Sequence, residues 1–150
     1  MDDVKKFHFK LQTLLDQRKS ILDMLQAELG EIRREEAAEL AYLGELRMRL
    51  DQGLAMVEAG LSGSASPVEV VQLDEYANAL RDDIKVQQLT IEAIRVRVEA
   101  KRVEVAEAMK QRKVIEALRD RQERDYVSAQ MRAEQNALDD LAALAYSRGS

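Results

Sequence analysis

The sequence contains no cysteine, no tryptophan, one proline and only two phenylalanines in 150 residues. Without cysteine the chain has no disulfide bond and no thiolate ligand for a metal. No apolar stretch approaches the ~18 residues that a membrane-spanning helix needs, and the opening MDDVKKFHFK lacks the apolar region of a secretory signal. We therefore expect a soluble, cytoplasmic protein.

What the sequence does contain is characteristic of long helices. Charged residues make up 34% of the chain, and its dominant residues are Ala, Leu, Glu, Arg, Gln and Val. This composition is typical of coiled coils rather than of compact aromatic cores. The net charge of −5 argues against a general nucleic-acid-binding protein, which would carry a basic surface. We predict an all-α fold.

The only proline lies in the stretch SGSASPVEVV, which interrupts an otherwise helix-compatible chain. Ser66 and Glu69 have the spacing of a capping box, with Pro67 at the first helical position, where a missing N–H costs nothing. Gly60 and Gly63 precede them and tolerate the left-handed conformation that often ends a helix. The stretch therefore predicts a helix end, a short loop and a strong helix start.

Apolar residues recur at alternating spacings of three and four on both sides of this loop, the period of a left-handed coiled coil. Before the loop the spacing shifts near Arg18 and again at RREEAAE, and the predicted seam consists of Val4, Phe7, Leu11, Leu14, Leu22, Leu25, Leu29, Ile32, Leu40, Leu43, Leu50, Leu54, Val57 and Leu61. After the loop one register includes Gln87 and Lys101 as polar members, and its apolar members are Leu73, Ala77, Leu80, Ile84, Ile91, Ile94, Val98, Val105 and Met109.

The short loop makes the two helices antiparallel neighbours. We predict a single domain, an antiparallel coiled-coil hairpin with a helix over about 4–60, a loop over about 61–66 and a helix over about 67–146. Because the second helix is longer, its last ~20 residues have no intramolecular partner.

Residues suited to catalysis or metal binding are few. His8 is the only histidine, and we interpret it as a surface or seam-edge residue. The acidic pairs Asp74/Glu75, Asp82/Asp83 and Asp139/Asp140 point about 100° apart on a helix and have no loop to complete a cation site, so we interpret them as solvated charge. The sequence has no phosphate-binding loop, dinucleotide-binding turn or nucleophile elbow. We expect no enzymatic activity, no cofactor and no metal.

A second apolar stripe runs along the helix after the loop, about 200° around from the seam. We call it the Val86–Val103 stripe, and its members are Val86, Leu89, Ala93, Val96, Ala100 and Val103. Two interpretations remain open. Either the seam is broad here or covered by the same chain, or the stripe is a docking face for another protein or a second copy.

Charge is also unevenly distributed. Between Arg95 and Arg124 there are ten Lys or Arg residues against six Asp or Glu residues. Interleaved glutamates favour a helix laced by ion pairs four residues apart. The alternative is a basic face that binds an acidic partner.

The C-terminal segment KQRKVIEALRDRQERDYVSAQMRAEQNALDDLAALAYSR resembles the C-terminal signature of the FliJ family, the flagellar type III export proteins. The matching elements are Lys113, Leu118, Arg121, Tyr126, Leu138, Asp139 and Asp140, with Asp140 where the family usually has glutamate. The opening FKLQTLLDQRK is similar to the family's as well, through Phe9, Leu11, Leu14, Leu15 and Arg18.

The resemblance implies a coiled-coil stalk that couples a hexameric export ATPase to the export-gate membrane protein and assists the recycling of export chaperones. It implies a location at the cytoplasmic face of the inner membrane. The hairpin pairing brings Lys5, Lys6 and Lys10 towards the basic residues that we assign to the ATPase ring, which are Arg112, Lys113, Arg119, Arg121 and Arg124. Towards the loop, the residues assigned to the gate are Tyr42, Leu46, Tyr76 and Leu80.

Two other classes of function are compatible with the residues alone. One is a coiled-coil tether or holdase-like protein unrelated to flagella, which would form a stable dimer through the Val86–Val103 stripe. The other is a nucleic-acid-binding hairpin, whose binding to DNA would be sensitive to salt.

Overall fold

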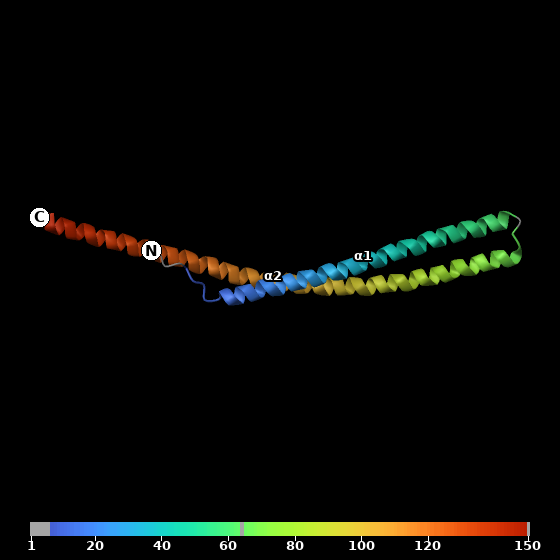
Figure 1. Cartoon of the computed structure of the whole chain (residues 1–150), viewed down its shortest axis with the longest axis horizontal. Coiled ribbons are helices and arrows are strands. Elements are labelled where there is room, and N and C mark those ends of the chain that lie inside the picture. Colours follow the sequence, from blue (N-terminus) through green and yellow to red (C-terminus); the bar gives the residue numbers. More distant parts are fainter. Residues whose placement is uncertain (1–6, 64, 150) are drawn as a thin grey trace. The chain divides into compact units, whose positions relative to one another are not determined.

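A computed structural model describes residues 7–63 and 65–149 and contains two helices, α1 (Gln12–Ser62) and α2 (Pro67–Gly149) (Figure 1). No strand occurs in either described range. The two helices pack against each other as a helical hairpin, which confirms the predicted fold class. Two compact units can be distinguished: unit 1 comprises Met1–Asp23 with Ala106–Ser150, and unit 2 comprises Met24–Val105.

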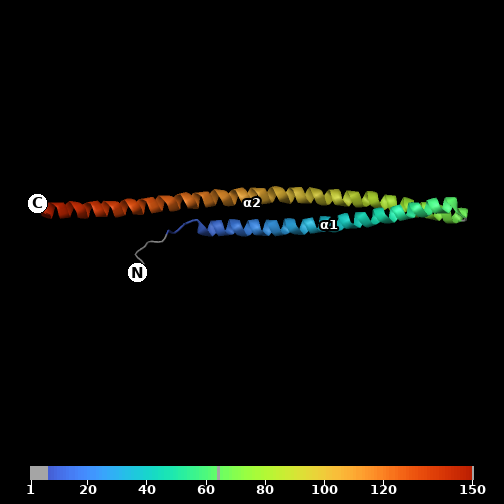
Figure 2. The same ribbon diagram turned by 90° about the horizontal axis from the view of Figure 1, so that it is seen from above.

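Within unit 2 the two helices lie side by side and antiparallel (Figure 2). Their buried residues repeat every three and four positions, as the sequence predicts for α2. The apolar core of unit 2 consists of Leu29, Leu43, Leu46, Ala77, Leu80, Ile91, Ile94 and Val105.

The two register shifts predicted for the first helix are wrong. The buried or half-buried residues of α1 follow one uninterrupted heptad register from Leu15 onwards. Three leucines assigned to the seam, Leu11, Leu40 and Leu61, are exposed. The register continues through RREEAAE because the glutamates at its seam positions, Glu36 and Glu39, find partners on α2.

The end of the predicted second seam also needs a correction. Met109 is partly exposed, and Ala108 is buried in its place. The spacing from Lys101 to Val105 is four, so a regular alternation continues by three to Ala108.

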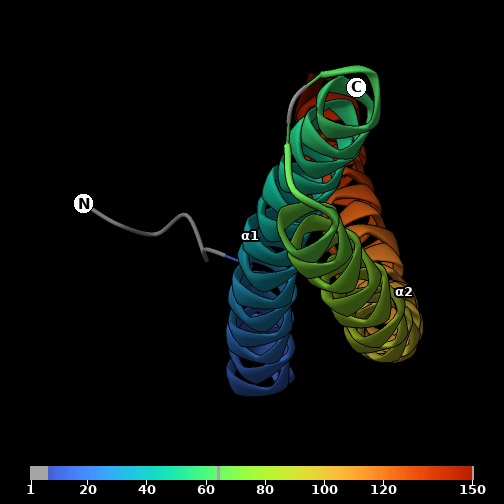
Figure 3. The same ribbon diagram turned by 90° about the vertical axis from the view of Figure 1, so that its right-hand side faces the viewer.

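In Figure 3 the end of the hairpin at which α1 passes into α2 faces the viewer. The hydrogen bonds at the start of α2 agree with a capping box in part. The Glu69 amide donates a hydrogen bond to Ser66 Oγ at 3.3 Å, and α2 begins at Pro67 as predicted. No described bond returns from the Glu69 carboxylate to the Ser66 amide. A single serine side chain therefore caps α2.

The preceding helix end differs from the prediction. No described glycine has a positive φ, so neither Gly60 nor Gly63 provides a left-handed end. Instead, Ser62 Oγ donates to the main-chain oxygens of Glu58 and Ala59 at 3.0 and 3.4 Å. A Cβ on Gly63 would lie 2.9 Å from the Ala59 oxygen, so this position requires glycine for space.

In unit 1 the first helix begins at Gln12, later than the predicted start near residue 4. Val4 lies outside the described residues. The Gln12 amide donates to the Phe9 oxygen at 3.1 Å, and the Phe9 ring is buried. Phe7 lies 5.8 Å from Tyr126, centroid to centroid, and holds this segment against α2. Residues 131–149 of α2 are exposed throughout, as expected for the end of the longer helix.

Candidate protein-interaction surfaces

The seam of unit 2 contains polar side chains that are paired across it. Gln87 Nε2 donates to the main-chain oxygen of Glu39 at 2.9 Å and also to its carboxylate. Lys101 Nζ lies 2.8 Å from carboxylate oxygens of both Glu28 and Glu104. The hydrogen bonds to Glu104 and then to Glu28 raise the pKa of Lys101 above its ordinary value. These pairs let polar groups occupy seam positions without being left unsatisfied.

The first part of the basic segment is likewise paired within the chain. Arg95 contacts Glu36 at 3.4 Å and Arg97 contacts Glu35 at 3.0 Å, both across the hairpin. A further pair along α2 joins Arg102 to Glu99. Up to Arg102 these pairs run across the hairpin or join residues three apart, and none has the predicted spacing of four along the helix. The paired cations are nevertheless not free for a partner.

Two of the five basic residues assigned to the ATPase ring also have intramolecular partners. Arg112 Nε donates to Glu116 Oε1 at 2.8 Å, and Arg119 lies 3.5 Å from Asp120. The Arg112 hydrogen bond holds the pKa of Glu116 below its ordinary value, and the charges of Lys19 and Arg119 add to this effect. Nearby, Arg18 Nη1 donates to Gln111 at 2.7 Å across unit 1.

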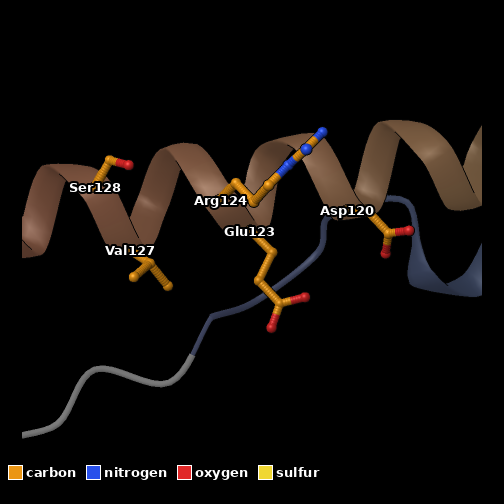
Figure 4. Close-up of a pocket in the computed structure, with 5 residues that line it drawn as sticks. All are labelled: Asp120, Glu123, Arg124, Val127 and Ser128. Carbon is orange, nitrogen blue, oxygen red and sulfur yellow. The ribbon is translucent and has the colours of Figure 1, made fainter.

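The other three, Lys113, Arg121 and Arg124, are exposed, and the described residues give none of them an ion pair. At 100° per residue they lie within about 80° of one another around α2. In Figure 4 Arg124 points away from the side on which Asp120, Glu123 and Val127 lie. Asp120, Glu123, Arg124, Val127 and Ser128 line a shallow hollow of about 650 Å³. Of the assigned cations, these three are the ones available to a partner. Lys10 is exposed as well, whereas Lys5 and Lys6 lie outside the described residues.

The structure corrects the surface expected for the gate. Leu46 and Leu80 are only 1% and 4% exposed, because both belong to the seam between α1 and α2. Tyr42 and Tyr76 are 43% and 48% exposed. The Tyr76 ring also covers Gly53, where an added Cβ would lie 3.5 Å from two ring atoms. Of the four residues assigned to the gate, only the two tyrosines are exposed enough to contact a partner.

The Val86–Val103 stripe is open to solvent. Its large members, Val86, Leu89, Val96 and Val103, are between 60% and 72% exposed. The stripe is therefore not a broadening of the seam within unit 2. Its apolar side chains are available for docking.

Residues suited to catalysis do not converge in the described part of the chain. There, no group of three or more histidine or acidic side chains could hold a metal ion. His8 is exposed. No described helix is long and apolar enough to cross a membrane.

Some contacts were not predicted from the sequence. These are the burial of Phe9 and the cross-hairpin bonds of Arg18, Glu36 and Glu39. Leu15, Leu22 and Leu29 are seven residues apart and Leu43 follows fourteen residues after Leu29, so the same heptad position in between is Glu36. This spacing is the signal that places Glu36 in the seam.

The fold and these surfaces define an antiparallel helical hairpin with exposed docking faces and no assembled catalytic group among the described residues. The family model described as "Flagellar FliJ protein" matches residues 7–150. The chain belongs to this family, and the family implies a component of the flagellar export apparatus. Neither a curated protein nor a solved structure matches the chain.

Proposed function

We propose that this protein couples the hexameric export ATPase to the export-gate membrane protein and assists the recycling of export chaperones. It acts in the cytoplasm at the inner membrane, as a binding protein without catalysis of its own. The observation that carries the proposal is the set of unpaired cations Lys113, Arg121 and Arg124 on α2, followed by the exposed segment 131–149. Unpaired charges next to a solvent-exposed helical segment suit a protein contact that forms and breaks during each cycle of ATP hydrolysis.

The three surfaces are assigned to three partners. Lys113, Arg121 and Arg124 contact the ATPase ring, with Arg112 and Arg119 contributing only where their intramolecular pairs open. Tyr42 and Tyr76 contact the gate through apolar burial. The Val86–Val103 stripe accepts an amphipathic helix of an export chaperone.

The test is a charge reversal with a matched control. Lys113, Arg121 and Arg124 are changed together to glutamate, and the rate of ATP hydrolysis by the export ATPase is measured with and without the protein. We expect the stimulation to be lost. The control reverses three exposed cations of unit 2, Arg33, Arg34 and Arg47, for which no ion pair is described. Equal stimulation by the parent and the first variant, or equal loss in both variants, contradicts the assignment.

One observation favours a second function. The exposed Val86–Val103 stripe would also pair two copies into a coiled-coil tether. Sedimentation equilibrium distinguishes the two functions, since the tether requires a stable dimer that Val96→Glu dissociates.

A further inference from the structure

The helix ends that flank the loop carry an apolar surface with very little charge. Between Gly53 and Leu73 only Glu58 and Glu69 are charged, in a chain that is 34% charged overall. Leu61, Val68 and Val71 are 71%, 65% and 55% exposed. Such side chains contribute nothing to the hairpin seam.

Two shallow hollows make this surface continuous. One, of about 380 Å³, is lined by Gly60, Leu61, Gly63, Ala65, Pro67, Val70 and Val71. The other, of about 430 Å³, is lined by Pro67, Val68, Val71, Gln72 and Glu75. Pro67 and Val71 belong to both, so the hollows adjoin. We call the surface formed by Leu61, Pro67, Val68 and Val71 the tip surface.

The start of α2 does not depend on the exposed side chains of Leu61, Val68 and Val71. Ser66 caps the helix, and a Cβ on Gly60 would lie 3.4 Å from Val70 Cγ2, a close contact on the inner side of the turn. Contiguous exposed apolar side chains that the fold does not use indicate a binding surface.

Acidic residues predominate in the two helix segments that the loop connects, and Glu75 lines one of the hollows. Residues 50–84 contain one basic residue, Arg81, and seven acidic residues: Asp51, Glu58, Glu69, Asp74, Glu75, Asp82 and Asp83. Their net charge of −6 exceeds the −5 of the whole chain, so the remainder is slightly basic. The described structure gives Glu58, Glu69 and Glu75 no ion pair.

The negative charge around the loop indicates which kind of partner the tip surface binds. An anionic membrane surface attracts basic segments and repels acidic ones. Two copies docked tip to tip would place like charges against each other, which electrostatic complementarity disfavours. We propose that the tip surface docks into an apolar groove of a partner protein, and that Lys or Arg residues form the rim of this groove.

The tip surface includes neither the cations assigned to the ATPase nor Tyr42 and Tyr76, so its contact does not depend on the proposed coupling function. The tip surface is small compared with the ~800 Å² per partner of a standard interface. We therefore expect a weak contact that exchanges readily.

Photo-crosslinking tests the proposal in the full chain. Benzoylphenylalanine replaces Val68, cells are irradiated, and the crosslinked peptide is identified by mass spectrometry. The control carries the same group at Met48, an exposed position of α1 distant in sequence from the loop. We expect Val68 to link to one protein segment with apolar residues flanked by Lys or Arg, and Met48 not to reach that segment.

Charge reversal then tests the rim. Glu58→Lys with Glu75→Lys should lower the Val68 crosslink yield roughly tenfold. Reversal of the acidic pair Asp139 and Asp140 in unit 1 should leave it unchanged. Circular dichroism establishes that each variant keeps its helicity. Crosslinks only to phospholipid, to a second copy or to a segment without basic residues overturn the proposal, as do the absence of any crosslink and a yield insensitive to the reversal.

Discussion

At the scale of single residues, a few side chains take the place of a large core. Ser66 is one of these side chains. Its Oγ accepts a hydrogen bond from the Glu69 amide, which is one of the amides that the start of a helix leaves unpaired. Pro67 follows it and removes another unpaired donor. The loop contains no second side chain that is described as bonding to an amide of the first turn of α2.

Ser66→Ala should therefore lower the free energy of unfolding by about 1 kcal/mol, the usual effect of losing a serine cap. Urea unfolding followed by circular dichroism measures the change. Ser128→Ala, on an exposed face of α2, is the matched control and should not destabilise the protein. Equal stability of the Ser66 variant and the parent would show that the cap does not limit the start of α2.

Glu116 links stability to pH. Its pKa is lowered in the folded protein, first by the hydrogen bond from Arg112. Because the pKa of Glu116 is lower in the folded protein than in the unfolded chain, its ionised carboxylate stabilises the fold at any pH above the unfolded pKa. This stabilisation is lost as the pH falls through the folded pKa. Glu116→Gln should therefore lower stability at pH 7 and have no comparable effect at pH 2.

The measurement is the midpoint of thermal unfolding at both pH values. Glu134→Gln, which changes an exposed glutamate without a described ion pair, is the control and should alter neither midpoint. A loss of stability that is the same at pH 7 and pH 2 would assign the effect of Glu116→Gln to lost packing instead of charge.

At the scale of the helices, the seam of α2 and its start after the loop were largely predictable, whereas the way in which α1 ends was not. Apolar spacing and the S-x-x-E pattern are local signals, and they placed the α2 seam and the start at Pro67 correctly. The register of α1 was not predictable from apolar residues alone. Glu36 and Glu39 hold seam positions only because Arg95 and Gln87 lie opposite, and that pairing exists only once the hairpin has formed.

Some of the residues predicted to bind partners are exposed and others are buried, and the sequence alone did not separate them because burial depends on the register of the hairpin. Leu46 and Tyr42 are four residues apart and both apolar or aromatic, yet Leu46 belongs to the heptad that begins at Leu15 and Tyr42 does not. Whether a cation is free also depends on its neighbours in space, since Arg112 is half-buried and paired with Glu116, whereas Arg124 is exposed and has no described ion pair.

Introducing glutamate should have little effect on the exposed stripe and a large effect in the seam. Val96→Glu adds a charge to a solvent-exposed face, so we expect the free energy of unfolding to change by less than about 0.5 kcal/mol. Leu46→Glu places a charge in the seam and should unfold much of the protein. Helicity and urea midpoints measured by circular dichroism test both. Loss of helicity in the Val96 variant would mean that the stripe supports the fold.

At the scale of the whole molecule, charge differs between the two units. Residues 24–105 carry a net charge of −6, and the remaining residues carry +1. The exposed cations proposed for the ATPase lie in unit 1, and the exposed tyrosines proposed for the gate lie in unit 2. The two contacts should therefore rely on different forces, and salt should separate them.

Tyr76→Ala should weaken binding to the cytoplasmic part of the gate protein roughly tenfold, as expected for an aromatic side chain at an interface. It should leave stimulation of the ATPase intact. Gate binding by the parent should persist at 0.5 M salt, because apolar burial is not screened, whereas ATPase stimulation should fall as salt shortens the Debye length below about 8 Å. Calorimetric titration and hydrolysis rates over a salt series give both quantities.

Tyr146→Ala is the matched control for that experiment, since Tyr146 is a more exposed tyrosine that lies in unit 1. It should not affect gate binding. Tyr76 also covers Gly53, so the variant's thermal midpoint must be compared with the parent's to separate lost contact from lost stability. If gate binding disappears at 0.5 M salt, or if the two tyrosine variants bind equally well, the gate contact is electrostatic or lies elsewhere, and Tyr76 does not carry it.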